Sequence, residues 1–358
     1  MPEILRIKAG YILVFVVLMF VISVAGGVLG DKFGGGFLGA PIAHIQLPAE
    51  PLTEGDLFPG FRVTNTMVTT WAAILLITIL SFGATRRMND IPHGLQNFFE
   101  SIIEFFLELA TSIAGPEKAR RFLPLSMTIF IFIVTANWMG ILPGFGTIGR
   151  IESADQVIHH AEDKHGRDLD LSTVKLQMFD DISGISMLLP GSVGPESEID
   201  AKQYHDEMDH HQTGITEGKT IGLLVPYLRS ANTEVNTTLA IAIVAMVMIH
   251  FWGFRALGVF GHAGKFINFK GGPIALFVGL LEIISEVARL ISFTFRLFGN
   301  IFAGEVLLIA IAFLLPLIGI IPFLGLELFV GLIQGLIFSI LTLVFAALST
   351  TGHGSEHH

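Results

Sequence analysis

Residues 296–305 read Arg296-Leu297-Phe298-Gly299-Asn300-Ile301-Phe302-Ala303-Gly304-Glu305 and lie in one of the most hydrophobic parts of the chain. A guanidinium keeps its proton in a protein, so Arg296 is a permanent charge at or near membrane depth. An arginine at the centre of a membrane helix costs roughly 2.5 to 3.5 kcal/mol on insertion scales. Such a residue faces a partner or a water-filled path, which predicts a functional site around Arg296.

The composition indicates a membrane protein that carries one separate polar segment. Of the 358 residues, 52% are hydrophobic and 15% are charged, whereas a soluble domain carries about a quarter charged residues. Cysteine is absent, which excludes disulfides, thiolate metal sites and cysteine nucleophiles. Residues 144–226 hold 15 Asp and Glu against 6 Lys and Arg, so the rest of the chain is nearly neutral.

Several apolar runs are long enough to cross a bilayer, which takes about 20 residues. We expect an all-α polytopic membrane protein with about six membrane helices, including a long tilted helical hairpin near the C-terminus. Pro143-Gly144 is expected to end the third helix, and Pro316 and Pro322 to break the chain before the last one. The runs are 9–30, 63–85, 122–149, 235–254, 271–305, 306–326 and 328 onward.

Lys and Arg gather on the cytoplasmic side of membrane proteins. If the spans alternate, the basic residues beside them fall on one side, and segments 31–62 and 144–226 lie outside. The first run also resembles a signal peptide, although its length of about 20 residues favours a retained anchor. Both termini are then cytoplasmic. The basic residues are Arg6, Lys8, Arg86, Arg87, Lys118, Arg120, Arg121, Arg255, Lys265 and Lys270.

Residues 94–114 predict an amphipathic helix. Apolar residues recur at helical spacing, while Glu100, Glu104 and Glu108 fall on another face. Because pairs of arginines flank it, we expect this helix at the cytoplasmic membrane surface. An ordinary helix packed on the outside of the protein would give the same pattern.

The polar insert, residues 150–222, combines many acidic residues with six histidines. We expect a solvated, partly disordered loop. Histidine and carboxylates also bind zinc or nickel, but these spacings match no tetrahedral site. No metal centre and no cofactor are therefore predicted. The histidines are His159, His160, His165, His205, His210 and His211.

The helix around Arg296 has a polar face. Glu282, Arg289 and Arg296 are spaced seven apart, so they lie nearly on one stripe. Charges that neutralise one another inside a packed bundle are the alternative, but each desolvated charge is costly. The polar residues that flank Arg296 on this face are Ser292 and Asn300.

A second set of polar residues lies on the last helix. Glu305 is half a turn out of phase with Arg296 and about 13 Å further along the axis, so the two charges belong to different places on a path. Arg296 and Gln334 have their midpoint at 315, and Glu305 and Glu327 have theirs at 316. One antiparallel fold-back near Pro316 would bring both pairs together.

The run from Phe295 to Glu305 resembles the signature of subunit a of F-type ATP synthases. Three weaker matches lie in the same order, at the start of the family's amphipathic helix, the end of its third helix and the start of its fourth. The resemblance covers about residues 60–145 and 223–350. The weaker matches are Pro92-His93-Gly94-Leu95-Gln96-Asn97-Phe98-Phe99-Glu100, Asn137-Trp138-Met139-Gly140-Ile141-Leu142-Pro143-Gly144 and Ala231-Asn232-Thr233-Glu234-Val235-Asn236-Thr237-Thr238-Leu239.

The resemblance implies that Arg296 is the essential arginine that faces the carboxylates of a rotating c-ring. Glu282 and Ser292 match positions nearer the outlet side. Family members often pair a His with a Glu at the positions of Glu305 and Glu327, whereas both are Glu here. The residues expected in or near the inlet half-channel are Glu305, Glu327, Asn300, Gln334 and Glu234.

The resemblance further implies a non-catalytic stator subunit that couples proton or sodium flow to ring rotation. Its partners would be the c-ring, the peripheral-stalk b subunits, the whole ATP synthase complex and the lipid bilayer, most simply a bacterial inner membrane, with no nucleic acid. An independent channel or secondary transporter would show an internal repeat or a self-contained midplane site, and we see no repeat. A purely structural anchor is the third hypothesis.

The expected division of the chain follows these observations. It comprises an anchor or uncleaved signal (1–30), an extracytoplasmic segment (31–62), the first span with the amphipathic helix and third span (63–149), the insert (150–222), the ion-translocating helices (223–350) and a cytoplasmic tail (351–358).

Overall fold

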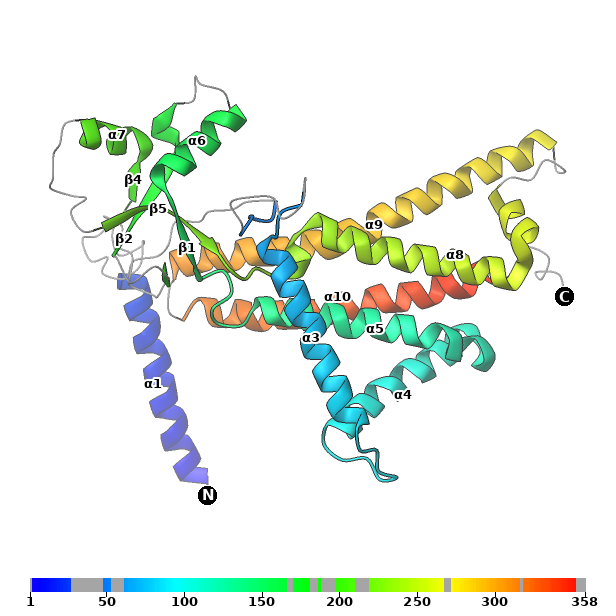
Figure 1. Cartoon of the computed structure of the whole chain (residues 1–358). Helices are drawn as coiled ribbons and strands as arrows, with labels where there is room; N and C mark the ends of the chain where they lie inside the picture. The colour runs from blue at the N-terminus through cyan, green and yellow to red at the C-terminus, as the bar shows by residue number, and fades with distance from the viewer. Residues whose placement is uncertain are drawn as a thin grey trace. The chain divides into compact units, whose positions relative to one another are not determined.

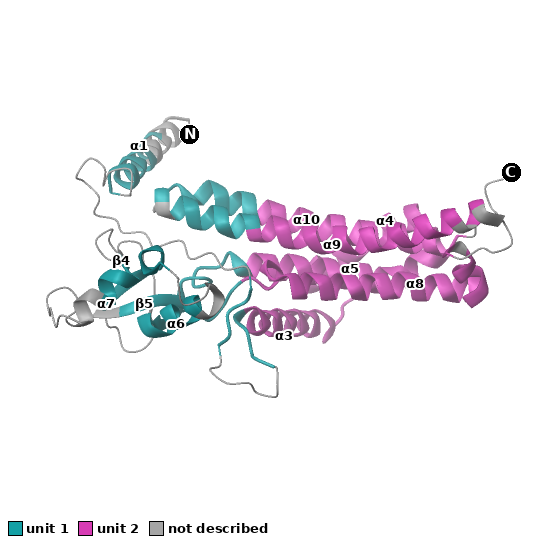
Figure 2. Cartoon of the chain, turned by 90° about the horizontal axis from the view of Figure 1, so that it is seen from above, with its two compact units in different colours: residues 1–65, 140–229, 303–327 teal, residues 66–139, 230–302, 328–358 magenta. Residues whose placement is uncertain are grey.

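The computed structural model describes most of the chain (Figure 1). The described residues are 2–26, 48–52, 61–165, 170–180, 186–187, 198–209, 219–266, 272–315 and 318–351. They form two compact units, coloured in Figure 2: the first holds residues 1–65, 140–229 and 303–327, and the second holds residues 66–139, 230–302 and 328–358.

The described residues form five helices that are long and apolar enough to cross a membrane. The expected all-α polytopic membrane fold is therefore confirmed, with a small sheet added to it. The first expected span forms α1 (Pro2–Gly26), whose described apolar part is Val14–Gly26. The five long helices are α3 (Asn65–Thr85), α5 (Pro116–Gly140), α8 (Val235–Phe266), α9 (Gly272–Leu314) and α10 (Ile320–Ser349).

Helices α9 and α10 make the expected C-terminal hairpin, although its details differ from the prediction. The runs 271–305 and 306–326 are not separate, because α9 continues through Glu305 to Leu314. Pro322 does not break the chain. It lies in the first turn of α10, where a missing backbone N–H costs no helical hydrogen bond. The predicted turn residue Pro316 lies outside the described residues.

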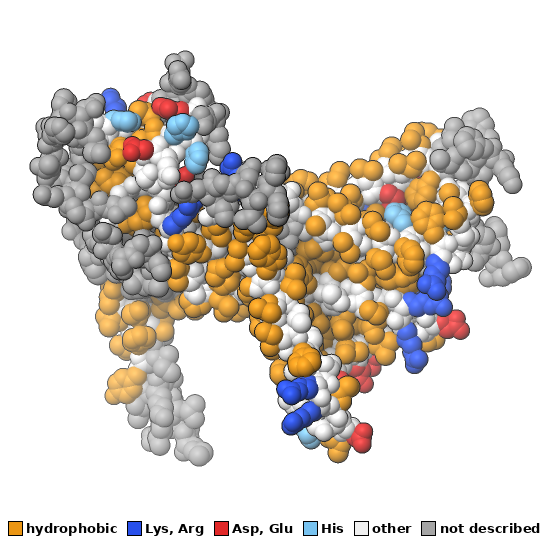
Figure 3. All heavy atoms as spheres, in the orientation of Figure 1, with side chains coloured by type: hydrophobic (Ala, Val, Ile, Leu, Met, Phe, Trp, Pro, Cys, Tyr) orange, Lys and Arg blue, Asp and Glu red, His pale blue; other side chains and the backbone are white. Residues whose placement is uncertain are grey.

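Two clusters of buried residues join the helices of the second unit. The first joins α4 (Leu95–Ala114) to α5, α8 and α10, with Phe106 and Phe122 among its largest buried side chains. The second joins α5, α8, α9 and α10. There Phe293 on α9 stacks near Phe338 on α10, with ring centroids 4.7 Å apart. Hydrophobic side chains also cover much of the visible helix surface, as a lipid-facing bundle requires (Figure 3).

The predicted amphipathic helix is α4, which begins and ends beside glycines. Gly94 and Gly115 both have positive φ, a conformation that favours glycine. One face packs into the bundle through Phe106 and Ala110, while Phe98 stays exposed. Amphipathicity is thus confirmed. Its position at the membrane surface stays a prediction, although basic side chains gather near its corner with α5 (Figure 3).

Helix α8 runs beyond the expected end at residue 254 and changes direction. Gly258 has φ 73°, so the helix is kinked there and continues to Phe266. Only glycine adopts this backbone conformation at little cost. The kink folds the last turns of α8 back toward its own earlier residues, and His262 packs against Gly253.

The first unit contains a five-stranded antiparallel sheet in the order β3-β1-β5-β2-β4. Two short helices pack on this sheet over a buried apolar cluster that includes Leu176 and Ile199. The strands are β1 (Ile148–Ser153), β2 (Lys175–Asp180), β3 (Ser186–Met187), β4 (Glu198–Asp200) and β5 (Lys219–Pro226); the helices are α6 (Ala154–His165) and α7 (Ala201–Asp209).

The prediction of a solvated, partly disordered loop for residues 150–222 is therefore wrong for the part that the structure describes. Ile221 and Leu223 on β5 alternate with polar or small residues, as do Leu176 and Met178 on β2, and all four are buried. Residues at every second position of a strand point to the same face, so these apolar side chains lie together in the cluster beneath the two helices. The acidic composition of the insert therefore does not prevent a buried core.

Candidate functional site

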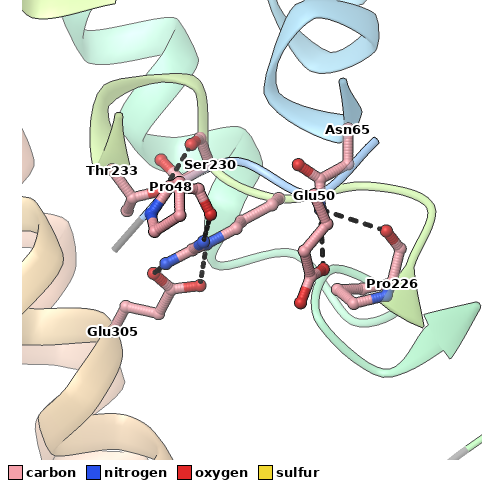
Figure 4. A network of polar contacts seen from close by, with 8 residues as sticks. Pro48, Glu50, Asn65, Pro226, Ser230, Thr233 and Glu305 are labelled. Atoms are coloured by element: carbon pink, nitrogen blue, oxygen red, sulfur yellow. Dashed lines mark hydrogen bonds and ion pairs between the residues drawn. The ribbon is translucent and has the colours of Figure 1, made fainter. Parts of the chain in front are cut away.

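A partly buried ion pair in the first unit joins α9 to the short segment that follows β5 (Figure 4). Arg229 Nε donates to both carboxylate oxygens of Glu305, at 3.0 and 3.2 Å, and Arg229 Nη2 donates to Oε2 at 3.0 Å. The Arg229 side chain is 7% exposed and that of Glu305 is 24% exposed. A forked contact with little water around it holds the carboxylate in place.

Glu50 is a second carboxylate near Arg229, and it comes from the extended segment before α3. The backbone of this segment pairs with the residues around the start of α3, since Leu52 N–H donates to the Val63 carbonyl and Asn65 N–H donates to the Glu50 carbonyl. Asn65 Nδ2 also donates to the Glu50 carboxyl at 3.1 Å and to the carbonyl of Pro226 at 3.2 Å (Figure 4). Desolvation by burial raises the pKa of Glu50 to about 7, against the opposing charge of Arg229.

Glu327 lies against Gly304, the residue before Glu305. The Glu327 side chain is buried, and its carboxyl group occupies the space where a Cβ on residue 304 would be. Glycine at 304 is therefore required for this close approach. The structure thus places Glu327 beside the α9 segment that carries Glu305, as the fold-back predicts. Instead of Glu327, however, Arg229 binds the Glu305 carboxylate.

In the second unit, Arg296 is half-buried on α9, and its Nη2 donates to Ser292 Oγ at 3.4 Å. Gln334 is buried on α10. Phe293 opposes Phe338 in this unit, and Gly304 opposes Glu327 in the first. The midpoint of the two residue numbers lies between 315 and 316 in both pairs. It agrees with the midpoints of 315 and 316 predicted from sequence, so the predicted register of the hairpin is confirmed. In antiparallel helices, that register puts Arg296 and Gln334 at the same level.

Glu234 lies at the start of α8. Its carboxylate accepts hydrogen bonds from Thr66 Oγ1 and, at 3.0 Å, from Asn236 Nδ2. Two predicted site residues remain. Glu282 is half-buried on the first half of α9, and Asn300 is exposed on α9. The structure therefore does not bring all eight predicted residues into one cluster.

The weaker sequence matches have a structural explanation in the second unit. Asn232, in the short helix η3 (Ala231–Thr233), donates to Asn137 Oδ1 at 2.7 Å. Asn137 Nδ2 in turn donates to the carbonyl of Gly331 on α10 at 3.3 Å, and Trp138 Nε1 donates to that of Leu328 at 3.0 Å. Buried amides of this kind tie α5, α10 and the start of α8 together.

Sequence reasoning missed Arg229 and Glu50. One signal was present for Arg229: it is an isolated arginine next to the fourth span, on the side where the rule for basic residues predicts few. Glu50 has no comparable signal, because its partners are distant in the sequence. Among the described residues, no group of three His, Asp or Glu is arranged to hold a metal ion.

Comparison with known proteins agrees with this architecture. The family model described as "ATP synthase A chain" matches residues 67–347. Similar proteins named ATP synthase subunit a come from Gloeobacter violaceus, 28% identical over 293 residues (82% of this chain and 86% of the relative), and from Helicobacter pylori, 28% identical over 305 residues (83% and 93%). One from Helicobacter acinonychis has the same identity and coverage as the latter.

The fold and the site define a polytopic membrane protein with charged groups held between its helices. The chain belongs to the ATP synthase A chain family. It is an integral membrane subunit of a bacterial ATP synthase and takes part in ATP synthesis and ion transport.

Proposed function

We propose that this chain is the stator subunit that provides two ion half-channels and places Arg296 opposite the carboxylates of the c-ring. A proton from outside neutralises a ring carboxylate, which then turns to face lipid. After rotation the carboxylate returns and releases its proton to the inside. In this scheme the chain is a non-catalytic subunit that guides protons, and ring rotation couples proton flow to ATP synthesis.

The placement of Arg296 carries this proposal. It is a permanent charge in an apolar helix, half-buried, at the level of Gln334, with a weak serine contact. A charge there attracts an ionised ring carboxylate and repels a proton that would pass directly from one half-channel to the other. A purely structural ion pair would need a carboxylate beside it, and among the described residues the salt bridges do not include Arg296.

The inlet half-channel is proposed to pass Glu305 and Glu327. Both lie at the turn end of the hairpin, and Glu327 is a buried carboxyl that can hold or release a proton. Arg229 and Glu50 extend this polar group beyond the residues expected from sequence. Asn300, Gln334 and Glu234 are assigned to the same path, and Glu282 and Ser292 to the outlet side.

The remaining assignments rest on charge and family membership. Arg86, Arg87, Arg120 and Arg121 are exposed at helix ends, and Arg255 is exposed shortly before the kink of α8. We assign these positions, with both termini, to the cytoplasm. The c-ring and the peripheral-stalk b subunits are the proposed direct partners. We retain the division of the chain given above, with the insert extended to residues 148–226 so that β1 and β5 are whole.

The test is replacement of Arg296 by Ala or Gln in the assembled complex. ATP synthesis, ATP-driven proton pumping and passive proton leak are measured in membrane vesicles. We expect coupled synthesis to be abolished, because neither side chain can hold an ionised ring carboxylate by charge. Arg255→Gln, at an exposed arginine on α8, is the matched control and is expected to keep synthesis.

Full coupled synthesis in Arg296→Ala would overturn the assignment. Purification of the intact complex separates the alternatives. A stator subunit co-purifies with a ring of small hairpin proteins that each carry a membrane carboxylate. An independent channel or transporter would conduct ions without that ring.

A further inference from the structure

A cluster of four ionisable side chains in the second unit is not used by the proposed inlet, the arginine or the predicted outlet residues. It contains His250 and His262 on α8 and Glu286 and Arg289 on α9. His250 Nδ1 lies 3.2 Å from His262 Nε2, and His250 Nε2 lies 3.6 Å from Glu286 Oε2. Arg289 Nη1 donates to the other oxygen of Glu286 at 2.5 Å.

The fold is built to bring the two histidines together. Gly258 allows the kink that returns the end of α8, and Gly253 leaves room for the imidazole of His262. His262 is 2% exposed, with the rings of Phe254 and Phe266 packed around it. A histidine in such a place is held in one orientation, and it fixes the ring of His250 through their shared hydrogen bond.

Arg289 fixes the carboxylate in a similar way. Its guanidinium lies 3.9 Å above the ring of Phe345, which limits its movement. Of the two carboxylate oxygens of Glu286, Oε1 accepts a hydrogen bond from Arg289. Glu286 Oε2 is buried and, within the described part of the chain, has no hydrogen-bond partner. A buried carboxylate oxygen without a donor is costly unless something binds there.

We propose that Glu286 and His250 form a proton relay on the outlet side of Arg296, with His262 and Arg289 as positioning residues. Glu286 lies ten residues before Arg296 on α9, whereas Glu305 lies nine residues after it. The relay thus belongs to the half of α9 away from Glu305. This inference rests on the proposed function, because it needs a ring carboxylate that releases a proton.

The proton is conserved through each step. Glu286 Oε2 accepts the proton that leaves a ring carboxyl, directly or through a water, and becomes a neutral carboxyl. It passes this proton to His250 Nε2, so His250 is positively charged and Glu286 is again a carboxylate. His250, whose side chain is 28% exposed, then releases a proton to water. A separation of 3.6 Å closes with a small side-chain movement or one bridging water.

A purely structural role would be the neutralisation of Arg289 by Glu286. That role needs one carboxylate oxygen and no histidine. It does not explain why the second oxygen is directed at a ring nitrogen rather than at a donor that satisfies it. It also leaves the paired histidines without a purpose in an apolar cluster, where two phenylalanines would pack at lower cost.

The test uses the whole ATP synthase in inverted vesicles, which expose the cytoplasmic side to the medium. Passive proton flux and ATP-driven pumping are measured for Glu286→Gln, Glu286→Asp, His250→Gln and His250→Ala. We expect flux to fall about tenfold or more in Glu286→Gln and His250→Gln, with recovery in Glu286→Asp. Added imidazole should restore flux in His250→Ala, because it replaces the lost proton carrier. Glu108→Gln and His93→Gln, at exposed positions, are the matched controls.

Wild-type flux in both Glu286→Gln and His250→Gln would overturn the relay. So would a loss of flux that neither aspartate nor imidazole restores, because the cluster would then be structural. If Glu286→Gln does not assemble, the test uses the His250 variants alone. Loss of flux in His250→Gln with rescue of His250→Ala by imidazole supports the relay, and wild-type flux in His250→Gln refutes it. Arg296→Gln is run in parallel: coupled synthesis in that variant refutes the proposed function itself, whereas the relay fails only by its own variants.

Discussion

The carboxyl of Glu50 gives the most quantitative prediction. Burial holds its pKa at about 7 instead of 4.5, against the attraction of Arg229. The folded segment therefore binds a proton that the opened segment releases, between about pH 4.5 and pH 7. A raised carboxyl pKa means that stability is complete below the lower value and is lost as the pH rises toward the higher one.

The magnitude follows from these two values. At 1.36 kcal/mol per pH unit, a carboxyl held at about 7 rather than 4.5 destabilises the closed segment by about 3 kcal/mol above neutral pH. This free energy raises the equilibrium constant for opening of the segment by a factor on the order of a hundred. Glu50→Gln removes the charge and keeps an oxygen that can accept from Asn65, so it should abolish the dependence.

Hydrogen exchange at residues 48–52 and 61–65 measures this opening. After correction for the intrinsic effect of pH on exchange, wild-type protection should fall between about pH 4.5 and about pH 7, and protection in Glu50→Gln should stay level. Glu162→Gln, the same change on α6, serves as the control. A wild-type pH dependence that survives in Glu50→Gln would refute the reasoning.

Further predictions address the rest of the first unit. Arg229→Met should lower the free energy of unfolding by up to about 3 kcal/mol, since Glu305 is only partly buried, and so lower the melting temperature of the purified complex. It should also reduce proton flux, and unchanged flux would contradict an inlet role. Gly304→Ala should reduce flux with normal assembly because the new methyl overlaps the Glu327 carboxyl, whereas Gly325→Ala meets open space and should be silent. Gly222→Ala should expose the insert to protease, because its Cβ overlaps the backbone of Glu152; an unchanged digestion pattern would argue against the sheet register.

The hairpin could be predicted from sequence because its geometry is simple. Two antiparallel helices have the same rise per residue, so one fold-back point fixes every opposing pair. The polar residues Arg296 and Gln334, and Glu305 and Glu327, reveal that point by their common midpoint. The observed pairs Phe293 with Phe338 and Gly304 with Glu327 have the same centre.

The insert was mispredicted because its acidic composition received more weight than its periodicity. In β2, Leu176 and Met178 are separated by Gln177, and in β5, Ile221 and Leu223 are separated by Gly222; this spacing of apolar residues is visible in the sequence. The Arg229–Glu305 pair is a different matter. Its members are far apart in the chain and belong to different elements, so no local pattern connects them. Only the packed structure reveals such contacts.

Arg229 also gives a physical account of an unusual feature of this sequence. The family resemblance leads us to expect a His with a Glu at the two positions that Glu305 and Glu327 occupy here. Two carboxylates without a cation would repel each other in an apolar setting. Arg229 supplies the positive charge from outside the pair and binds Glu305 through a fork, while Glu327 stays buried beside Gly304. On the proposed inlet role, one carboxyl is thereby held in place and the other exchanges protons. Arg229→Gln should then be tolerated better when Glu305 is changed to His in the same chain, and proton flux no higher in the double variant than in Arg229→Gln would contradict this account.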